Sequence, residues 1–306
     1  MNEEVHTKDI IYNSASYFLK IADFSIKMSF ENIDVNNINL LASLNAFIIS
    51  SSKIDDDRLF DLKITESLPN SSYSYIGTFD TGNGDTIVNR SDDEGYKFTI
   101  KDTNKNTCCE LLANKNFSKC FCKLNGNINM RRFGLNNALM MTFAFAASFK
   151  ETLLIHASAI RENEFGYAFI AKSGTGKSTH TGLWLKYIKG CDLLNDDNPI
   201  IRIINGIPYM YGSPWSGKTP CYRNIKTRLH AITRIDRAEK NYIEQLKPTE
   251  AFASLLPSCS TMKWDKIIYS AICNNIIHII EKINIYTLHC LPDKNAAILC
   301  HKQIRK

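Results

Sequence analysis

Short apolar runs separated by polar turns fill the first 130 residues of the chain. Residues 17–21 and 96–100 are two such runs, and both have the alternating or apolar character that is typical of strands. The segments between these runs are rich in Asn, Asp, Ser and Gly, which favour turns. We therefore predict that residues 1–130 form a mainly β accessory region that recognises a substrate.

The pattern changes near residue 130, where apolar positions begin to recur at helical spacing. Residues 135–149 carry Leu139, Met140 and Phe143 at this spacing, which predicts a packed helix. Further elements follow in order: strands at 153–160, 166–170 and 193–197, with a helix at 177–188 between the last two. Strands that alternate with helices indicate an α/β domain, which we place at residues 131–306.

The same alternation continues to the end of the chain. Asn205-Gly206 divides an apolar stretch at 199–210, which predicts a hairpin with a type I′ turn. Beyond the hairpin we predict a helix at 249–256 that Thr249 caps, a longer helix at 261–282, a strand at 283–291 and a last helix that Asp293 caps.

Composition narrows the class of protein. The 306 residues are 44% hydrophobic and 22% charged, which is ordinary for one or two globular domains. The formal charge of +6 is spread along the chain without a block of basic and aromatic residues, so we expect no nucleic-acid partner. We expect no membrane partner and a cytoplasmic location, because the sequence has no apolar run of about 18 residues and no signal-peptide pattern at its start.

Ten cysteines are too dilute in a chain of this length to form a disulfide framework. Four of them lie close together in the sequence: Cys108, Cys109, Cys120 and Cys122. Zinc is one interpretation of this cluster, but its spacings differ from the usual C-x₂-C pattern. Free thiols in strands, kept reduced, are the interpretation we favour.

Residues 171–178, Ala-Lys-Ser-Gly-Thr-Gly-Lys-Ser, match the phosphate-binding loop pattern except that Ala171 replaces the first glycine. A predicted strand precedes the loop and a predicted helix follows it, so the positive end of the helix faces the expected phosphates. In this pattern Lys177 reaches the β- and γ-phosphates and the Ser178 hydroxyl ligates Mg²⁺. The predicted nucleotide-contacting residues are Ser173, Gly174, Thr175, Gly176, Lys177, Ser178 and Thr179.

Paired carboxylates follow at the end of the predicted strand 193–197. Asp196 and Asp197 lie about one strand–helix–strand unit after the loop, where an Mg²⁺-nucleotide site needs hard oxygen ligands. One carboxylate can hold the metal and the other can accept a proton from an attacking hydroxyl. A surface turn at Asp-Asp-Asn-Pro is the competing interpretation.

His156 interrupts the predicted strand at 153–160. A lone histidine in an apolar strand is usually a hydrogen-bonded core residue, and a functional histidine is the alternative.

The order His156, loop 171–178 and Asn195-Asp196-Asp197 resembles the catalytic domain of bacterial HPr kinase/phosphorylase and its relatives. The resemblance covers about residues 135–306, does not reach residues 1–130, and implies the phosphoenolpyruvate carboxykinase type of P-loop nucleotide fold. It implies that Asp196 is the base, that Asp197 is a Mg²⁺ ligand and that His156 lies close to the phosphates. The segment 212–218 is also similar to a loop in small HPr-kinase-like proteins, and it makes Lys218 a candidate for stabilising the transferred phosphoryl group.

Two departures limit this resemblance. Thr179 stands where the family has an acidic residue directly after the loop serine, and no counterpart of the glycine-rich signature of the reverse reaction is present. We therefore predict a kinase without phosphorylase activity.

The predicted activity is transfer of the γ-phosphoryl group of ATP, with Mg²⁺, to a serine hydroxyl of a peptide or protein. A kinase of a free sugar or amino acid and a non-catalytic nucleotide sensor are the alternatives. The family enzyme assembles into oligomers, so a homo-oligomer is implied by the resemblance, but no stripe of residues in this sequence indicates an interface.

Overall fold

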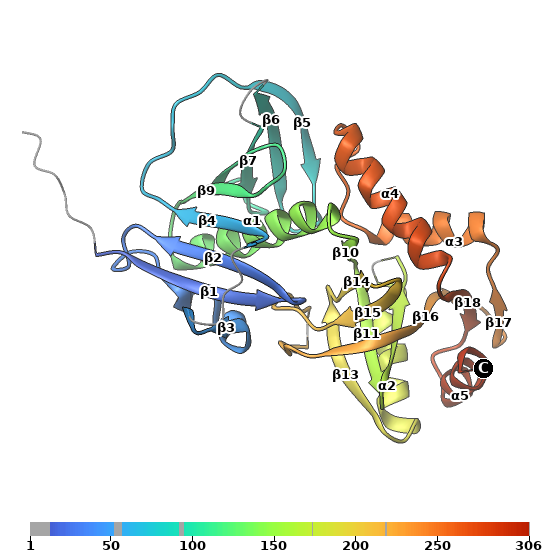
Figure 1. Cartoon of the computed structure of the whole chain (residues 1–306). Helices are drawn as coiled ribbons and strands as arrows, with labels where there is room; N and C mark the ends of the chain where they lie inside the picture. The colour runs from blue at the N-terminus through green and yellow to red at the C-terminus, as the bar shows by residue number, and fades with distance from the viewer. Residues whose placement is uncertain (1–12, 52–56, 92–94, 173, 218, 306) are drawn as a thin grey trace, which may run out of the picture.

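The computed structural model describes residues 13–51, 57–91, 95–172, 174–217 and 219–305. They form a mixed α/β protein with two large sheets, one from each half of the chain (Figure 1). The predicted Ser173 and Lys218 lie outside the described residues.

The first sheet has nine strands in the order β3-β1-β2-β4-β9-β8-β7-β6-β5. The strands from β5 to β9 pair antiparallel with their sequence neighbours, whereas β4 pairs parallel with both β2 and β9. The predicted strands 17–21 and 96–100 lie within β1 and β7. The elements are β1 (Ala15–Ile21), β2 (Phe24–Phe30), the 3₁₀ segment η1 (Ile38–Phe47), β3 (Ile48–Ile49), β4 (Phe60–Ile64), β5 (Ser74–Asp80), β6 (Asp85–Ser91), β7 (Gly95–Lys101), β8 (Thr107–Ala113) and β9 (Lys119–Leu124).

Helix α1 (Ile128–Ser148) connects the two sheets (Figure 1). It begins seven residues before the predicted position, because the Asn127 side chain caps it by accepting from the N–H groups of Asn129 and Met130. Gly134 lets the helix approach β8 closely, since a Cβ there would lie 2.6 Å from the carbonyl oxygen of Cys108. One hydrophobic core extends from the first sheet through α1 into the second sheet.

The second sheet follows the order β10-β14-β15-β16-β12-β11-β13, with β18 paired to β16 and β17 paired to β18. Asn205 and Gly206 have φ values of 51° and 75°, which confirms the predicted hairpin with a type I′ turn. The strands are β10 (Thr152–Leu154), β11 (Ala157–Glu162), β12 (Phe165–Ile170), β13 (Cys191–Asp197), β14 (Ile200–Ile204), β15 (Ile207–Tyr211), β16 (Lys226–Arg237), β17 (Tyr242–Gln245) and β18 (Asn284–Cys290).

The prediction of one strand at 153–160 is wrong, because the chain divides there into β10, at one end of the main strand order, and β11, next to the strand at the other end. The backbone N–H of Ile155 donates to Pro199 O, and that of His156 donates to Ser258 O. These bonds turn the backbone from one pairing to another, and they place His156 between two strands instead of inside one.

Four helices complete the second half: α2 (Lys177–Tyr187), α3 (Pro248–Leu255), α4 (Lys266–Ile280) and α5 (Lys294–Ile304), with the short 3₁₀ segment η3 (Leu256–Ser258) after α3. Asp293 caps α5 as predicted. Thr249 lies inside α3, whose first residue is Pro248, and α4 starts only after Asp265 accepts from two N–H groups of its first turn. No described helix is long and apolar enough to span a bilayer.

The four clustered cysteines are buried free thiols on β8 and β9. The Sγ atoms of Cys109 and Cys122 lie 3.2 Å apart, and burial raises the pKa of the Cys109 thiol. Among the described residues, no group of three or more His, Cys, Asp and Glu side chains is arranged to hold a metal ion.

Candidate active site

The loop 171–178 connects β12 to α2 at the carboxyl end of a strand. Gly174 and Gly176 have φ values of 75° and 128°, which side chains rarely adopt. A Cβ built on either glycine would have no atom within 4 Å, so the space beside both glycines is open. Because Gly176 immediately precedes α2, this opening lies at the N-terminal end of a helix of 11 residues.

Lys177 and His156 meet beside this loop. The Nζ atom of Lys177 lies 2.8 Å from Nε2 of His156 and donates at 3.3 Å to the carbonyl oxygen of Ala171. Burial lowers the pKa of Lys177, while the nearby Asp197 and Asp196 oppose this shift. The structure thus joins two side chains that are 21 positions apart in the sequence.

The two carboxylates contact different partners. Ser178 Oγ donates to Oδ1 of Asp196 at 3.2 Å, and Asp196 is only 5% exposed. Asp197 Oδ1 lies 3.1 Å from Nδ1 of His156, and its Oδ2 accepts from the Asn198 amide at 2.7 Å. Lys177, His156 and Asp197 therefore form one continuous chain of polar contacts.

Asp197 also has an unusual backbone conformation, with φ at 141°. This region is unfavourable for a residue with a side chain and is typically found at functional sites. Bonds from the segment 213–217 hold the strand end in place: Ser216 Oγ donates to Asp196 O at 3.1 Å, and the Gly217 N–H donates to the same oxygen. Asn195 also holds this segment, because its amide donates to Ser213 Oγ and Trp215 O.

The segment 213–217 therefore lies beside the end of β13. Lys218 itself lies outside the described residues, so its assignment stays a prediction. Thr179 is an exposed residue in the first turn of α2, and Thr175 is half-buried in the loop.

Arg237 is a site residue that the sequence did not reveal. Its guanidinium donates to the carbonyl oxygens of Thr175 and Gly174 at 3.0 and 2.7 Å. In the sequence, Arg237 is one of several Lys and Arg residues between positions 218 and 240, a pattern that usually indicates a solvent-exposed face. Its position became clear only because β16 runs parallel to β12 and ends beside the loop.

His180, on α2, points its side chain into the core. It is 2% exposed, and its Nε2 accepts from the Trp184 indole N–H at 3.0 Å. Burial lowers the pKa of His180 to about 4, so this imidazole stays neutral at physiological pH.

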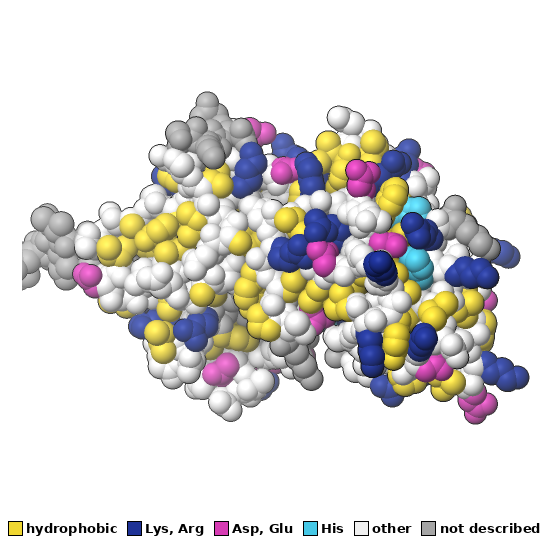
Figure 2. Space-filling view, turned by 90° about the horizontal axis from the view of Figure 1, so that it is seen from below, with side chains coloured by type: hydrophobic (Ala, Val, Ile, Leu, Met, Phe, Trp, Pro, Cys, Tyr) yellow, Lys and Arg dark blue, Asp and Glu magenta, His cyan; other side chains and the backbone are white. Residues whose placement is uncertain are grey.

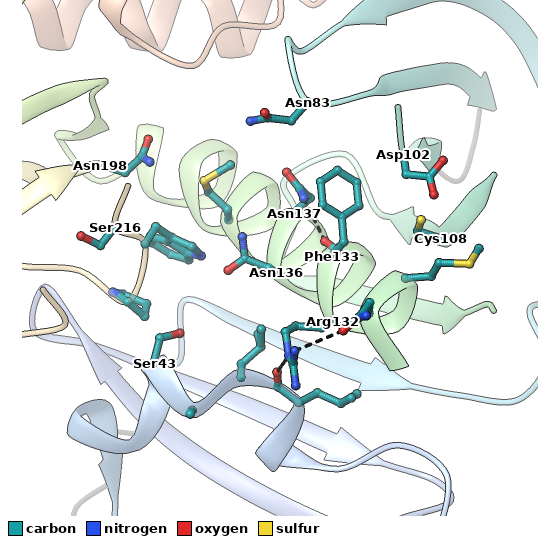
Figure 3. Close-up of a pocket in the computed structure, with 18 of the residues that line it drawn as sticks. Ser43, Asn83, Asp102, Cys108, Arg132, Phe133, Asn136, Asn137, Asn198 and Ser216 are labelled. Atoms are coloured by element: carbon teal, nitrogen blue, oxygen red, sulfur yellow. Dashed lines mark hydrogen bonds between the residues drawn. The ribbon is translucent and has the colours of Figure 1, made fainter. Parts of the chain in front are cut away.

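A pocket of about 1070 Å³ has Asp197 in its lining. Figure 3 shows this pocket. The segment 197–198, the segment 214–217 and Tyr222 line one part of it, and η1, α1 and the turns and strands of the first sheet line the other. We call it the amide pocket, because its lining includes seven asparagines: Asn39, Asn83, Asn127, Asn129, Asn136, Asn137 and Asn198.

The fold and site therefore define a mixed α/β protein with a glycine-containing loop at a helix N-terminus, facing a lysine, a histidine and two carboxylates. The sequence matches no known protein-family profile. No curated protein sequence matches it either. Among solved structures, the chain is similar to the HPr(Ser) kinase/phosphatase from Coxiella burnetii, with a TM-score of 0.29 and 13% identity over 50% of this chain and 93% of that one. A TM-score this low gives no information about function, so a functional proposal has to rest on the side-chain contacts.

Proposed function

We propose that this protein is an ATP- and Mg²⁺-dependent kinase of the HPr-kinase-like P-loop type, with the phosphoenolpyruvate carboxykinase type of nucleotide fold, that phosphorylates a serine hydroxyl of a peptide or protein. The observation that carries the proposal is the meeting of Lys177, Ser178, His156, Asp196 and Asp197 at one loop. In phosphoryl transfer, catalysis comes mainly from positioning the reactants and neutralising charge.

The open loop fits a triphosphate. Its glycines leave room for backbone N–H groups to approach phosphate oxygens, and the N-terminus of α2 favours negative charge there. Lys177 loses some hydration through burial, which strengthens its interaction with an anion. In this proposal Lys177 leaves His156 when phosphates enter and pairs with the β- and γ-phosphate oxygens.

The oxygen atoms beside the loop fit a magnesium ion. Proteins usually hold Mg²⁺ through one or two carboxylates together with substrate phosphates and water. Ser178 Oγ and the two aspartates supply such oxygens within one small region. A bound Mg²⁺ would neutralise the charge of the transferred phosphoryl group.

The two aspartates divide the remaining work. We assign proton removal from the acceptor hydroxyl to Asp196 and metal binding to Asp197 with Ser178, following the family resemblance. His156 holds Asp197 through its Nδ1 atom and so positions the carboxylate. Ser178 contacts Asp196 directly, so the reverse assignment has Asp196 on the metal and Asp197 as the base. The two assignments predict different responses to the Mg²⁺ concentration.

Transfer from γ-labelled ATP into size-fractionated lysate tests the proposal. Wild-type protein should label a peptide or protein, and Lys177→Ala should abolish this label. Lys189→Ala is the matched control, since Lys189 is an exposed lysine beyond the end of α2 and should leave transfer unchanged. Label confined to small molecules would identify a metabolite kinase, and ATP binding without transfer would identify a nucleotide sensor.

A further inference from the structure

The amide pocket extends well beyond the reacting groups. Asn198 and Ser216 lie at one end, while Asp102, just after β7, and Cys108, on β8, lie at the other end (Figure 3). Pockets for single small ligands usually measure about 300–1000 Å³. At about 1070 Å³ this pocket has room for several residues of a chain in addition to a reacting hydroxyl.

The walls of the pocket carry few charges and combine carboxamides with apolar side chains such as Leu40, Phe133 and Trp215. Among the described lining residues, the charged side chains are Asp102, Arg132 and Asp197, against seven asparagines. A carboxamide both donates and accepts hydrogen bonds, and so does each residue of a peptide backbone. An uncharged polar chain therefore matches these walls better than an acidic or basic one.

Three of the carboxamides are free to bind a ligand. The side chains of Asn39, Asn83 and Asn136 form no hydrogen bond with any described residue, whereas the Asn137 amide is bonded to Phe133 O. Asn39 belongs to η1, Asn83 lies in the turn between β5 and β6, and Asn136 is on α1. A ligand that contacts all three must therefore bridge three separate elements of the fold.

We propose that the amide pocket binds the phosphoryl acceptor as an extended peptide, with uncharged polar residues flanking the serine. The proposal rests on the proposed kinase function, since the pocket delivers the serine to the Asp196–Asp197 pair. It assigns the choice of acceptor to η1, α1 and the first sheet, and the transfer chemistry to the second sheet.

A peptide library with a fixed central serine and randomised flanking positions tests this assignment, with γ-labelled ATP and Mg²⁺ as the donor. Wild-type protein should select Ser, Thr, Asn, Gln or Gly next to the serine. Asn136→Asp should raise the preference for Lys or Arg at one or two flanking positions by roughly tenfold, because it adds a carboxylate to the wall. Asn136→Ala should raise KM for the best peptide about tenfold at unchanged kcat, since it removes only hydrogen bonds to the acceptor.

Asn163→Asp is the matched control, because it makes the same chemical change in the exposed turn between β11 and β12, away from the pocket. It should leave the selection unchanged. If Asn136→Asp selects the same peptides as wild type, the pocket assignment is wrong although the kinase function stands. If wild type labels small hydroxyl compounds but no library peptide, the peptide acceptor is wrong, and ATP binding without any transfer would overturn both proposals.

Discussion

The two sheets of this protein are similar in size but differ in the chemistry they carry. The region around the first sheet contributes mainly neutral amides to the amide pocket, from η1, α1 and the turn after β5, whereas the second half of the chain carries the lysine, histidine and carboxylates that meet at the loop. On the face shown in Figure 2, Lys, Arg and His side chains gather over the second half of the chain, while the other half is mostly uncharged or hydrophobic. Under the proposed function, acceptor recognition and phosphoryl transfer would therefore belong to separate regions that share a hydrophobic core.

The largest effects should come from the second sheet, where substitutions separate the two aspartates. Asp196→Asn should lower kcat about 10²- to 10⁴-fold at saturating Mg²⁺, because it removes the proposed base. Asp197→Asn should instead raise the Mg²⁺ concentration needed for half-maximal activity. Steady-state kinetics at several Mg²⁺ concentrations measures both, and exchanged responses would show that the roles are reversed.

Phe143 tests whether the two regions fold together. Its ring on α1 lies 6.3 Å from that of Phe24 in the first sheet and 5.4 Å from that of Trp215 beside the site. Phe143→Ala should cost about 3–5 kcal/mol of the free energy of unfolding, because it leaves a cavity in the shared core. Urea denaturation should show one transition shifted as a whole, and two separate transitions would contradict a shared core.

Phe149→Ala is the control for that experiment. Phe149 lies just after α1 and is 39% exposed, so its removal should change stability by less than about 1 kcal/mol.

His180 should make the folding stability of the protein depend on pH. Its pKa is about 4 in the folded protein and near 6.5 in the unfolded chain, so the unfolded chain binds the extra proton first as pH falls. Folding stability from this group should be complete above pH 6.5 and should decrease by roughly 3 kcal/mol toward pH 4. Urea titrations of wild type and His180→Gln should show a flatter pH profile in the variant, and equal profiles would contradict the buried neutral imidazole.

The smallest effect concerns Arg237, which fixes the loop from the neighbouring strand. Arg237→Ala should raise KM for ATP about tenfold, because two hydrogen bonds to loop carbonyls are lost. Arg228→Ala is the control, since Arg228 is exposed near the other end of β16. Equal KM values in the two variants would show that the loop needs no such support.

Most of the local elements could be predicted from the sequence. Asn205-Gly206 and Asp293 act through their own backbone geometry or through adjacent N–H groups, so the hairpin and the α5 cap were predicted correctly. Helix starts at α1 and α4 were misplaced because Asn127 and Asp265, which cap them, lie where the apolar pattern gives no signal.

Residue types at short spacing were enough to predict the loop, the order of His156, Lys177 and the aspartates, and the α/β character of the second half. The division of the chain at His156, the contact of Arg237 with the loop and the position of the amide pocket beside Asp197 could be seen only in the folded protein. These features depend on which strands become neighbours and on how the two sheets pack around α1. Contacts between residues so far apart in the chain leave no periodic trace in the sequence.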